Sequence, residues 1–412
     1  MQINMSTLDT PVMNTPIANQ SASVEGKICI DIFRQQQNTG TVTVRSSRPL
    51  QASQLLIGKT PQQALSIIPL VFSICGVAQS RAAIACFEQM LHISTEPEIE
   101  TARDMLVLVE NTKEHLLRLF IDWPRLFQLT PDNTSLLYPA QILAGFKNAL
   151  FHQGEAFRFD SLLNDHISDT DYLIDKLEQY LQENVFDCQP ADWLKIRNTD
   201  ELHQWALQTE TIAAKSIAVI CEQGLASQGL TDYHQLPAID DKALLKKFDA
   251  PNAQQFIEQP EWNGTCYETT VLSRQFKQAL VQSLHDEFQT SLITRWVARL
   301  VELAGMPKQL RDSLEQITHK TQQARALQNK TGMGIKQVEA ARGRLVHRVK
   351  ISDGIIHNYQ ILAPTEWNFH PRGLAAKSLA TLAASRQNSI DQAAHLLINA
   401  IDPCVGYDLR IH

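Results

Sequence analysis

Residues 344–362 read RLVHRVKISDGIIHNYQIL, and apolar and polar residues alternate on both sides of Ser352-Asp353-Gly354. Alternation with a period of two is typical of a half-buried strand, and an Asp-Gly pair between two such runs is a strong hairpin signal. The pattern therefore predicts two antiparallel strands, Arg344 to Ile351 and Ile355 to Leu362. The C-terminal part of the chain is therefore expected to contain a β-hairpin.

The N-terminal part predicts a second hairpin, because Val24 to Phe33 and Thr41 to Val44 alternate around a Gln/Asn/Gly turn. Between the hairpins apolar residues recur in steps of three and four, which is typical of amphipathic helices. The expected helical segments are Thr60 to about Tyr180, Thr199 to Ser227, Ser273 to Ala304, Pro307 to Gln328 and Leu374 to about Ala400. We therefore expect a mainly α fold with small β elements (α+β), in which a central helix bundle receives β-hairpins from near both ends of the chain.

The composition is that of a globular protein: 412 residues, 44% hydrophobic and 20% charged. Such a chain can bury a large core, and we expect a single domain over residues 24–412. Residues 1–23 are rich in Asn, Gln, Ser, Thr and Pro, which predicts a disordered tail. The net charge of -7 and the lack of a long Lys/Arg run argue against nucleic acid as a partner.

Location is predicted from apolar runs and cysteines. No apolar run is long enough to cross a bilayer, so we expect no membrane partner. The seven cysteines are an odd number without any Cys-x-x-Cys pair, and the N-terminus lacks a secretory signal. We therefore expect a cytoplasmic protein with reduced thiols, in which any cysteine chemistry combines residues far apart in sequence.

Two segments each contain a cysteine in an unusual local sequence. Near the start the chain reads Phe72-Ser-Ile-Cys75-Gly76-Val77-Ala78-Gln79, and near the end Ile401-Asp402-Pro403-Cys404-Val405-Gly406-Tyr407. A glycine beside Cys75 allows close backbone approach, and a proline before Cys404 restricts the backbone, so both thiols can be held rigidly. Rigid thiols suit soft metal ions, whereas either cysteine alone is more simply a small core residue.

These two segments resemble the cysteine motifs of nickel-iron hydrogenase large subunits, Arg-x-Cys-Gly-x-Cys and Asp-Pro-Cys-x-x-Cys, which together supply four thiolates. Four further stretches are similar to the same family: Val24-Glu25-Gly26, Gly58-Lys59-Thr60-Pro61, Glu339-Ala-Ala-Arg342-Gly343 and Pro364 to Arg372. The resemblance runs from about Val24 to Cys404 and is weakest between about Leu129 and Ser273. It implies the fold of the large subunit over the whole domain.

The departures from the family motifs change the implied function. In the family, the second cysteine of each motif bridges nickel to an iron that carries two cyanides and one carbon monoxide; here Ala78 and Tyr407 stand at those positions. Alanine has no donor atom, and a mostly protonated phenol replaces a thiolate poorly. Ser73, Ala82 and Ala341 also replace residues of the catalytic motifs, and Ser53 falls roughly where the family has a glutamate for its structural metal.

The resemblance therefore implies a catalytically degenerate homologue, specifically a hydrogenase expression/formation accessory protein of the HupK/HoxV type. Its metal ligands would be Cys75 and Cys404, and Glu25, Arg342 and Asp402 would surround a transiently bound iron-dicyanide-carbonyl unit, with nickel not expected. The implied partners are a hydrogenase maturation chaperone, which delivers the unit, and the hydrogenase large-subunit precursor, which receives it. The chain stops at His412, so we expect no nickel-triggered removal of a C-terminal extension.

Two alternatives stay open. A divergent nickel-iron hydrogenase large subunit would be an oxidoreductase that tolerates Ala78 and Tyr407, and a metal-free assembly chaperone would bind only the precursor. Three histidines of the C-terminal hairpin and the loop after it show no metal-ligand pattern and are interpreted as surface or structural residues, and the five remaining cysteines are interpreted as packing residues. They are His347, His357, His370, Cys29, Cys86, Cys188, Cys221 and Cys266.

Overall fold

The computed structural model describes residues 26–34, 40–48, 50–130, 134–165, 168–232, 234–317, 331–384 and 390–412. The tail predicted over residues 1–23 and the candidate residue Glu25 lie outside these ranges. In the described part, no single helix is long and apolar enough to cross a membrane. The helices Pro61–Val71 and Ser73–Leu91, which are bent relative to each other, have the length and apolar composition of a membrane span only when they are taken together.

The first sheet joins the two ends of the chain. Its strands are β1 (Ile28–Arg34), β2 (Gly40–Ser46) and β6 (Tyr407–Ile411), in the order β2-β1-β6. The antiparallel β1/β2 pair confirms the predicted N-terminal hairpin, and β6 adds a parallel partner that the sequence pattern did not indicate. Ile28, Ile30 and Ile32 alternate along β1 and are buried, so this strand is anchored in the core.

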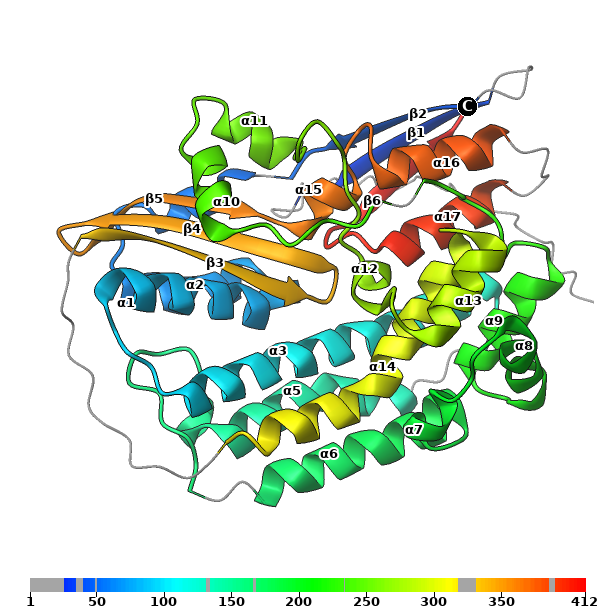
Figure 1. The fold of residues 1–412 in the computed structure, drawn as a ribbon, viewed down its shortest axis with the longest axis horizontal. Helices are drawn as coiled ribbons and strands as arrows, with labels where there is room; N and C mark the ends of the chain where they lie inside the picture. The colour runs from blue at the N-terminus through cyan, green and yellow to red at the C-terminus, as the bar shows by residue number, and fades with distance from the viewer. Residues whose placement is uncertain are drawn as a thin grey trace, which may run out of the picture.

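The second sheet is the meander β3 (Gly332–Ala340), β4 (Gly343–Ser352) and β5 (Ile355–Leu362). The β4/β5 pair confirms the predicted C-terminal hairpin, whose turn residues Asp353 and Gly354 both have positive φ. Helix α2 (Gly76–Leu91) packs against β3 and β4 (Figure 1). A Cβ at Gly334 would come within 2.3 Å of the Cys86 carbonyl oxygen, so glycine permits this close approach.

Helices make up most of the rest, and their bounds are as follows. They are α1 (Pro61–Val71), α3 (Pro97–Leu117), α4 (Trp123–Phe127), α5 (Leu137–Leu150), α6 (Ser168–Leu181), α7 (Pro190–Trp193), α8 (Thr199–Gln208), α9 (Ile212–Glu222), α10 (Asp241–Phe248), α11 (Ala253–Glu258), α12 (Val271–Gln275), α13 (Ala279–Phe288), α14 (Leu292–Leu314), α15 (Pro364–Asn368), α16 (Leu374–Ala384) and α17 (Ile390–Ile401). Helices α3, α5, α6 and α14 run side by side as a bundle below the second sheet (Figure 1).

Several helix boundaries differ from the prediction. The segment Thr199 to Ser227 contains two helices, α8 and α9, and the predicted last helix from Leu374 is described as α16 and α17, with residues 385–389 outside the described ranges. The segment Ser273 to Ala304 is not one helix but spans the end of α12, α13 and part of α14. Pro307, predicted to begin a helix, lies inside α14. The helix continues past Pro307 because Leu303, Met306 and Leu310 on either side are buried, and burial outweighs the one backbone hydrogen bond that proline cannot donate.

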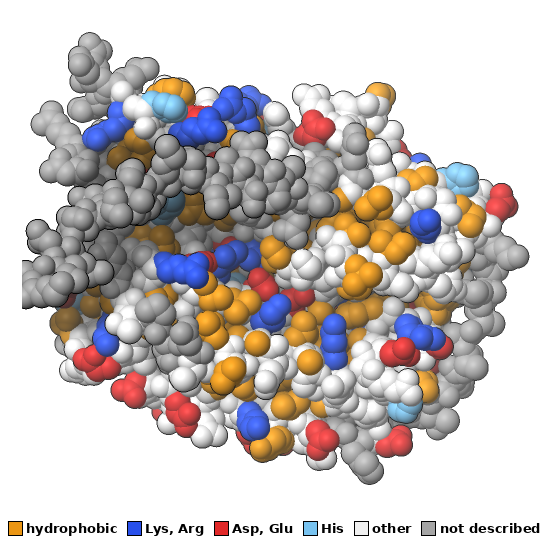
Figure 2. Space-filling model, turned by 180° about the vertical axis from the view of Figure 1, so that it is seen from behind, with side chains coloured by type: hydrophobic (Ala, Val, Ile, Leu, Met, Phe, Trp, Pro, Cys, Tyr) orange, Lys and Arg blue, Asp and Glu red, His pale blue; other side chains and the backbone are white. Residues whose placement is uncertain are grey.

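One hydrophobic core contains residues from both chain ends, from Ile28 in β1 to Val405 beyond α17. At its centre the rings of Trp123 and Trp296 lie 4.0 Å apart. The predicted mainly helical class with two small β elements is confirmed. The face opposite to Figure 1 shows hydrophobic side chains interspersed with basic and acidic ones (Figure 2).

Candidate functional site

Cys75 is held at the start of a buried helix. Helix α1 ends before a short turn, η2 (Ser73–Cys75), and α2 begins at Gly76. The N–H groups of Val77 and Ala78 donate to the two carboxylate oxygens of Glu110, at 2.8 and 2.9 Å. Glu110 on α3 therefore satisfies donors that a helix start leaves without a partner, and it fixes the position of the neighbouring thiol.

The electrostatic surroundings of Cys75 favour the protonated thiol. Burial, the nearby Cys404 thiol and the Glu110 carboxylate raise the pKa of Cys75 to about 12. A helix N-terminus usually lowers a thiol pKa, but burial and negative neighbours outweigh that effect here. Burial also raises the pKa of Glu110 itself to about 7, although the Val77 and Ala78 N–H groups oppose this.

A chain of buried polar groups leads to the Cys75 sulfur. Burial lowers the pKa of His347 to about 3, so this imidazole is neutral. Its Nδ1 lies 2.8 Å from the Tyr359 hydroxyl and its Nε2 lies 2.6 Å from the Gln79 Oε1. With the Gln79 oxygen accepting from Nε2, the Gln79 Nε2 is left to donate to the Cys75 Sγ at 3.5 Å. His347 is thus a structural residue that orients Gln79.

Cys404 follows the end of α17. Asp402 has a φ of 63°, and its N–H donates to the Ile398 carbonyl at 2.8 Å, which closes the helix before Pro403. The Cys404 Sγ lies 2.9 Å from the Thr365 Oγ1, and the Cys404 N–H donates to the same oxygen at 3.4 Å. Thr365, on α15, thus holds both the backbone and the sulfur of Cys404.

The two cysteines line the same cavity, of about 530 Å³. Their sulfurs come from near opposite ends of the sequence, as the sequence analysis required. Apolar side chains form much of the wall, namely Leu55, Leu70, Val71, Phe72, Ile74 and Ile361. A mostly apolar wall with two thiols and two arginines, Arg48 and Arg342, suits a compact ligand that carries both soft and polar atoms.

Arg342 is held by buried carboxylates behind the thiols. It donates to Glu114 at 3.1 and 3.2 Å and to Asp402 at 3.2 Å. Burial alone would lower the pKa of Arg342, but Asp402, Glu114 and the two cysteines raise it, so the side chain stays charged. Arg342 lines the cavity.

Asp402 acts from behind the cavity wall. It is absent from the described residues that line the cavity, and its carboxylate is surrounded by Arg118 at 2.8 Å, Arg342 at 3.2 Å and Arg299 at 3.5 Å. Burial opposes ionisation, but these arginines lower the pKa of Asp402 to about 2. Asp402 therefore positions Arg342 and the Cys404 turn.

Arg48 is a cavity residue that the sequence analysis did not identify. It lies after β2 and donates to Glu366 of α15 at 2.5 Å. Although burial would lower the pKa of Arg48, Cys404, Glu366 and Cys75 raise it. Nothing in the local sequence Ser-Ser-Arg-Pro signals this role, since its partners are more than three hundred residues away in the chain.

The positions that lost the bridging cysteines do not reach the cavity. Ala78 is buried, and the Tyr407 hydroxyl lies 2.7 Å from the His395 Nδ1 on α17. Neither is among the described residues that line the cavity, whereas Ser53, Ser73 and Ala341 are. The site therefore offers two thiols where the hydrogenase motifs supply four.

Comparison with known proteins shows which proteins this chain is similar to. Residues 251–406 match the family described as nickel-dependent hydrogenase. The "hydrogenase expression/formation protein HupV" of Azotobacter chroococcum is 28% identical over 94% of this chain and 98% of its own length. The chain is therefore similar to the nickel-dependent hydrogenase family in residues 251–406 and to a hydrogenase expression/formation protein over nearly its whole length. The "hydrogenase expression/formation protein HoxV" of Cupriavidus necator is another relative from end to end, 28% identical over 92% of this chain and 94% of its own.

Solved structures of this family share the fold. An NAD⁺-reducing nickel-iron hydrogenase in its H₂-reduced state matches with a TM-score of 0.59 and 14% identity, over 90% of this chain and 94% of the other. The chain therefore shares the overall fold of this hydrogenase.

Proposed function

We propose that this chain is a hydrogenase expression/formation protein that transiently binds an iron-dicyanide-carbonyl unit between Cys75 and Cys404 and passes it to the hydrogenase large subunit. The observation that carries the proposal is the shared cavity of the two thiols. The full-length relatives bearing the expression/formation name support it.

The cavity chemistry suits this cargo. Thiolates are soft ligands that match low-valent iron. Cyanide nitrogens accept hydrogen bonds, and the guanidinium groups of Arg48 and Arg342 are charged donors on the same wall. The apolar remainder of the wall accommodates carbon monoxide and keeps water away from the unit.

A site with two thiolate ligands favours transfer of the iron unit over its permanent retention. With Ala78 buried and Tyr407 turned to His395, the chain supplies no bridging thiolates for a second metal at this cavity. Binding must also displace the proton that Cys75 holds with its pKa of about 12. Proton uptake by Cys75 can therefore accompany release of the iron unit, and we do not expect nickel to bind.

The proposed partners follow from this transfer. A small maturation chaperone would deliver the iron unit, and the large-subunit precursor, which shares this fold, would receive it. We place both steps in the cytoplasm, where reduced thiols persist.

The test is metal analysis and infrared spectroscopy of the chain purified anaerobically from a host with the hydrogenase maturation machinery. We expect iron together with cyanide and carbonyl stretching bands, and no nickel. Cys75→Ala and Cys404→Ala should each abolish the bands, whereas Cys221→Ala, a change at a half-buried cysteine on α9, should leave them intact.

Other outcomes would contradict the proposal. Iron with nickel in stoichiometric amounts would indicate a divergent hydrogenase, and the absence of both metals would indicate a metal-free chaperone. Bands that persist in Cys75→Ala would remove that residue as a ligand.

A further inference from the structure

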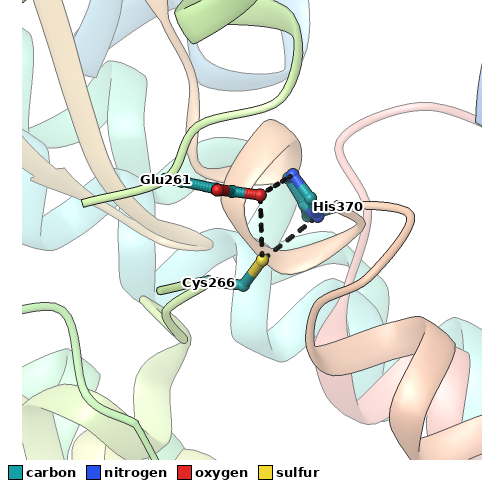
Figure 3. A group of neighbouring side chains, drawn as sticks. All are labelled: Glu261, Cys266 and His370. Atoms are coloured by element: carbon teal, nitrogen blue, oxygen red, sulfur yellow. Dashed lines mark hydrogen bonds and ion pairs between the residues drawn. The ribbon is translucent and has the colours of Figure 1, made fainter. Parts of the chain in front are cut away.

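A second group of potential metal ligands lies outside the cavity. Glu261 and Cys266 flank the tight hairpin turn Trp262-Asn263-Gly264-Thr265, and His370 follows α15. Figure 3 shows the three side chains pointing toward one another. Among the described residues they are the group of three metal-binding side chains whose ligand atoms all lie within 4.8 Å of one another.

The turn explains why Glu261 and Cys266 face each other. Asn263 and Gly264 have φ values of 51° and 75°, as a two-residue hairpin turn with Asn-Gly requires. Trp262 and Thr265 exchange two backbone hydrogen bonds of 3.0 Å. Residues 261 and 266 are therefore the next opposed pair, and opposed side chains project on the same face of a hairpin.

His370 completes the group from another part of the chain. Its Nδ1 lies 3.3 Å from the Cys266 Sγ, and its Nε2 lies 3.6 Å from the Glu261 Oε1. The imidazole is buried, with 1% of the residue exposed, and its Nε2 has no hydrogen-bond partner among the described residues. A buried ring nitrogen aimed at a carboxylate without a hydrogen bond is the second observation that points to a ligand.

The separations suit a tetrahedral ion. With metal–nitrogen and metal–oxygen bonds of about 2.0 Å and a metal–sulfur bond of about 2.3 Å, tetrahedral ligands lie roughly 3.3–3.5 Å apart. One nitrogen of His370, the Cys266 Sγ and one Glu261 oxygen all lie within 4.8 Å of one another, with 3.3 Å from Sγ to Nδ1 and 4.0 Å from Sγ to Oε1. Some of these separations exceed the ideal ones, so ion binding requires side-chain rotations that bring the three ligand atoms closer to a common point.

The present contacts can yield to an ion. Arg372 pairs with Glu261 through its side chain, and its N–H donates to the His370 Nδ1 at 3.0 Å. The Arg372 side chain is 74% exposed, so it can leave Glu261 for water at little cost. Coordination through Nδ1 would replace the Arg372 N–H bond. Coordination through Nε2 would place the ring proton on Nδ1, which could then no longer accept that bond, so either mode gives it up.

Charge also favours a divalent cation. A glutamate, a thiolate and a neutral imidazole carry two negative charges, which a divalent cation neutralises. Burial and then the Glu261 carboxylate raise the pKa of Cys266, whereas Arg372 and Lys377 lower it, so a bound cation is needed to make the thiolate dominant at neutral pH. Burial likewise lowers the pKa of His370, which keeps its lone pair available as a ligand.

We propose that Glu261, Cys266 and His370 form a binding site for a borderline divalent cation such as Zn²⁺, with a fourth position open to solvent or a partner. One sulfur, one nitrogen and one carboxylate ligand make up a donor set that such ions accept. This proposal differs from the sequence-based interpretation of Cys266 and His370 as packing or structural residues. The inference does not depend on the iron unit in the cavity.

The test uses the full chain carrying Cys75→Ser and Cys404→Ser, so that the cavity thiols cannot bind the probe. Co²⁺ is titrated by absorption spectroscopy under reducing conditions, and Zn²⁺ competes for the same site. We expect one Co²⁺ per chain, with tetrahedral bands and a thiolate-to-cobalt charge-transfer band. Cys266→Ser in this background should abolish the charge-transfer band.

Matched variants separate coordination from folding. Because loss of even an outer-sphere partner weakens metal binding about 10–100-fold, Glu261→Gln and His370→Gln should each weaken Co²⁺ binding at least tenfold. Cys188→Ser, at another half-buried cysteine, should bind as the parent does. Should His370→Gln fail to fold, Glu261→Gln at the partly exposed hairpin still decides. Absence of Co²⁺ binding in the parent, or unchanged affinity in Cys266→Ser and Glu261→Gln, would overturn the proposal.

Discussion

The surroundings of Cys75 and Cys404 differ although both thiols line one cavity. Cys75 lies beside Glu110 and accepts a weak bond from Gln79, and its pKa is raised to about 12. Cys404 lies beside the Thr365 hydroxyl, and it contributes more than Cys75 to the raised pKa of Arg48. On the first side of the cavity the thiol retains its proton, and on the second side the sulfur lies beside a hydroxyl group, so the two sides offer a ligand different polar surroundings.

The largest expected effect follows from replacing Arg342, which lies behind both cavity thiols. Arg342→Leu would leave Glu114 without its guanidinium partner and weaken the arginine cage of Asp402. Removing one partner from a buried ion pair costs about 3–5 kcal/mol. Chemical denaturation should show a loss of this size in the free energy of unfolding.

Arg342→Lys is the matched control, since it keeps the charge but loses the forked geometry, and an intermediate loss is expected. A stability of Arg342→Leu equal to that of the parent would mean that the two sides of the cavity do not depend on this residue.

A smaller effect should be confined to the Cys75 side. Glu110→Gln removes a carboxylate that raises the Cys75 pKa, so the pH midpoint for alkylation of Cys75 should fall below about 12, by up to roughly one unit. The rate is followed peptide by peptide with mass spectrometry. Glu315→Gln, an exposed change just after α14, should leave the midpoint for Cys75 unchanged.

The same variant should alter how stability depends on pH. The pKa of Glu110 is raised in the folded state to about 7, so its neutral form stabilises the fold fully below about pH 4.5, and this contribution is lost as pH rises through 7. In Glu110→Gln that decline between about pH 4.5 and 7 should disappear. An unchanged pH profile would show that Glu110 is not the buried acid on the Cys75 side.

The smallest effect should be confined to the Cys404 side. Thr365→Val removes the hydroxyl that lies 2.9 Å from the Cys404 sulfur and accepts the Cys404 N–H. Loss of these contacts should lower the free energy of unfolding by about 1 kcal/mol. Chemical denaturation should show this loss. Thr365→Ser should behave as the parent, and an equal loss in Thr365→Ser would contradict the hydroxyl's role.

Much of the fold could be predicted because its signals are local. The alternation of residues 344–362 and the Asp353-Gly354 turn specify β4 and β5 without reference to the rest of the chain. Strand β6 could not be predicted in the same way, because its five residues acquire a partner only when β1 lies beside them. The prediction that a helix begins at Pro307 was wrong for a related reason. The burial that allows α14 to continue through Pro307 depends on tertiary packing.

The residues of the site also divide into those with a local sequence signal and those without one. Cys75, Cys404 and Arg342 stand in motifs that resemble a known family, and all three line the cavity. Arg48, Thr365 and His370 act through partners that are distant in sequence, so local patterns do not identify them. The Asn263-Gly264 turn could have predicted that Glu261 and Cys266 lie opposite each other, but it could not have predicted that His370 lies beside them.

Strand β6 pairs in parallel with β1 and begins three residues after Cys404. Docking of this last strand therefore requires that nearly the whole polypeptide has been synthesised and folded, and contacts of such long sequence separation form slowly. A ribosome-bound chain would hold Cys75 alone, without its counterpart. The two thiols would therefore share one cavity only late in folding, after the segment that contains Cys404 has left the ribosome and packed against the rest of the fold.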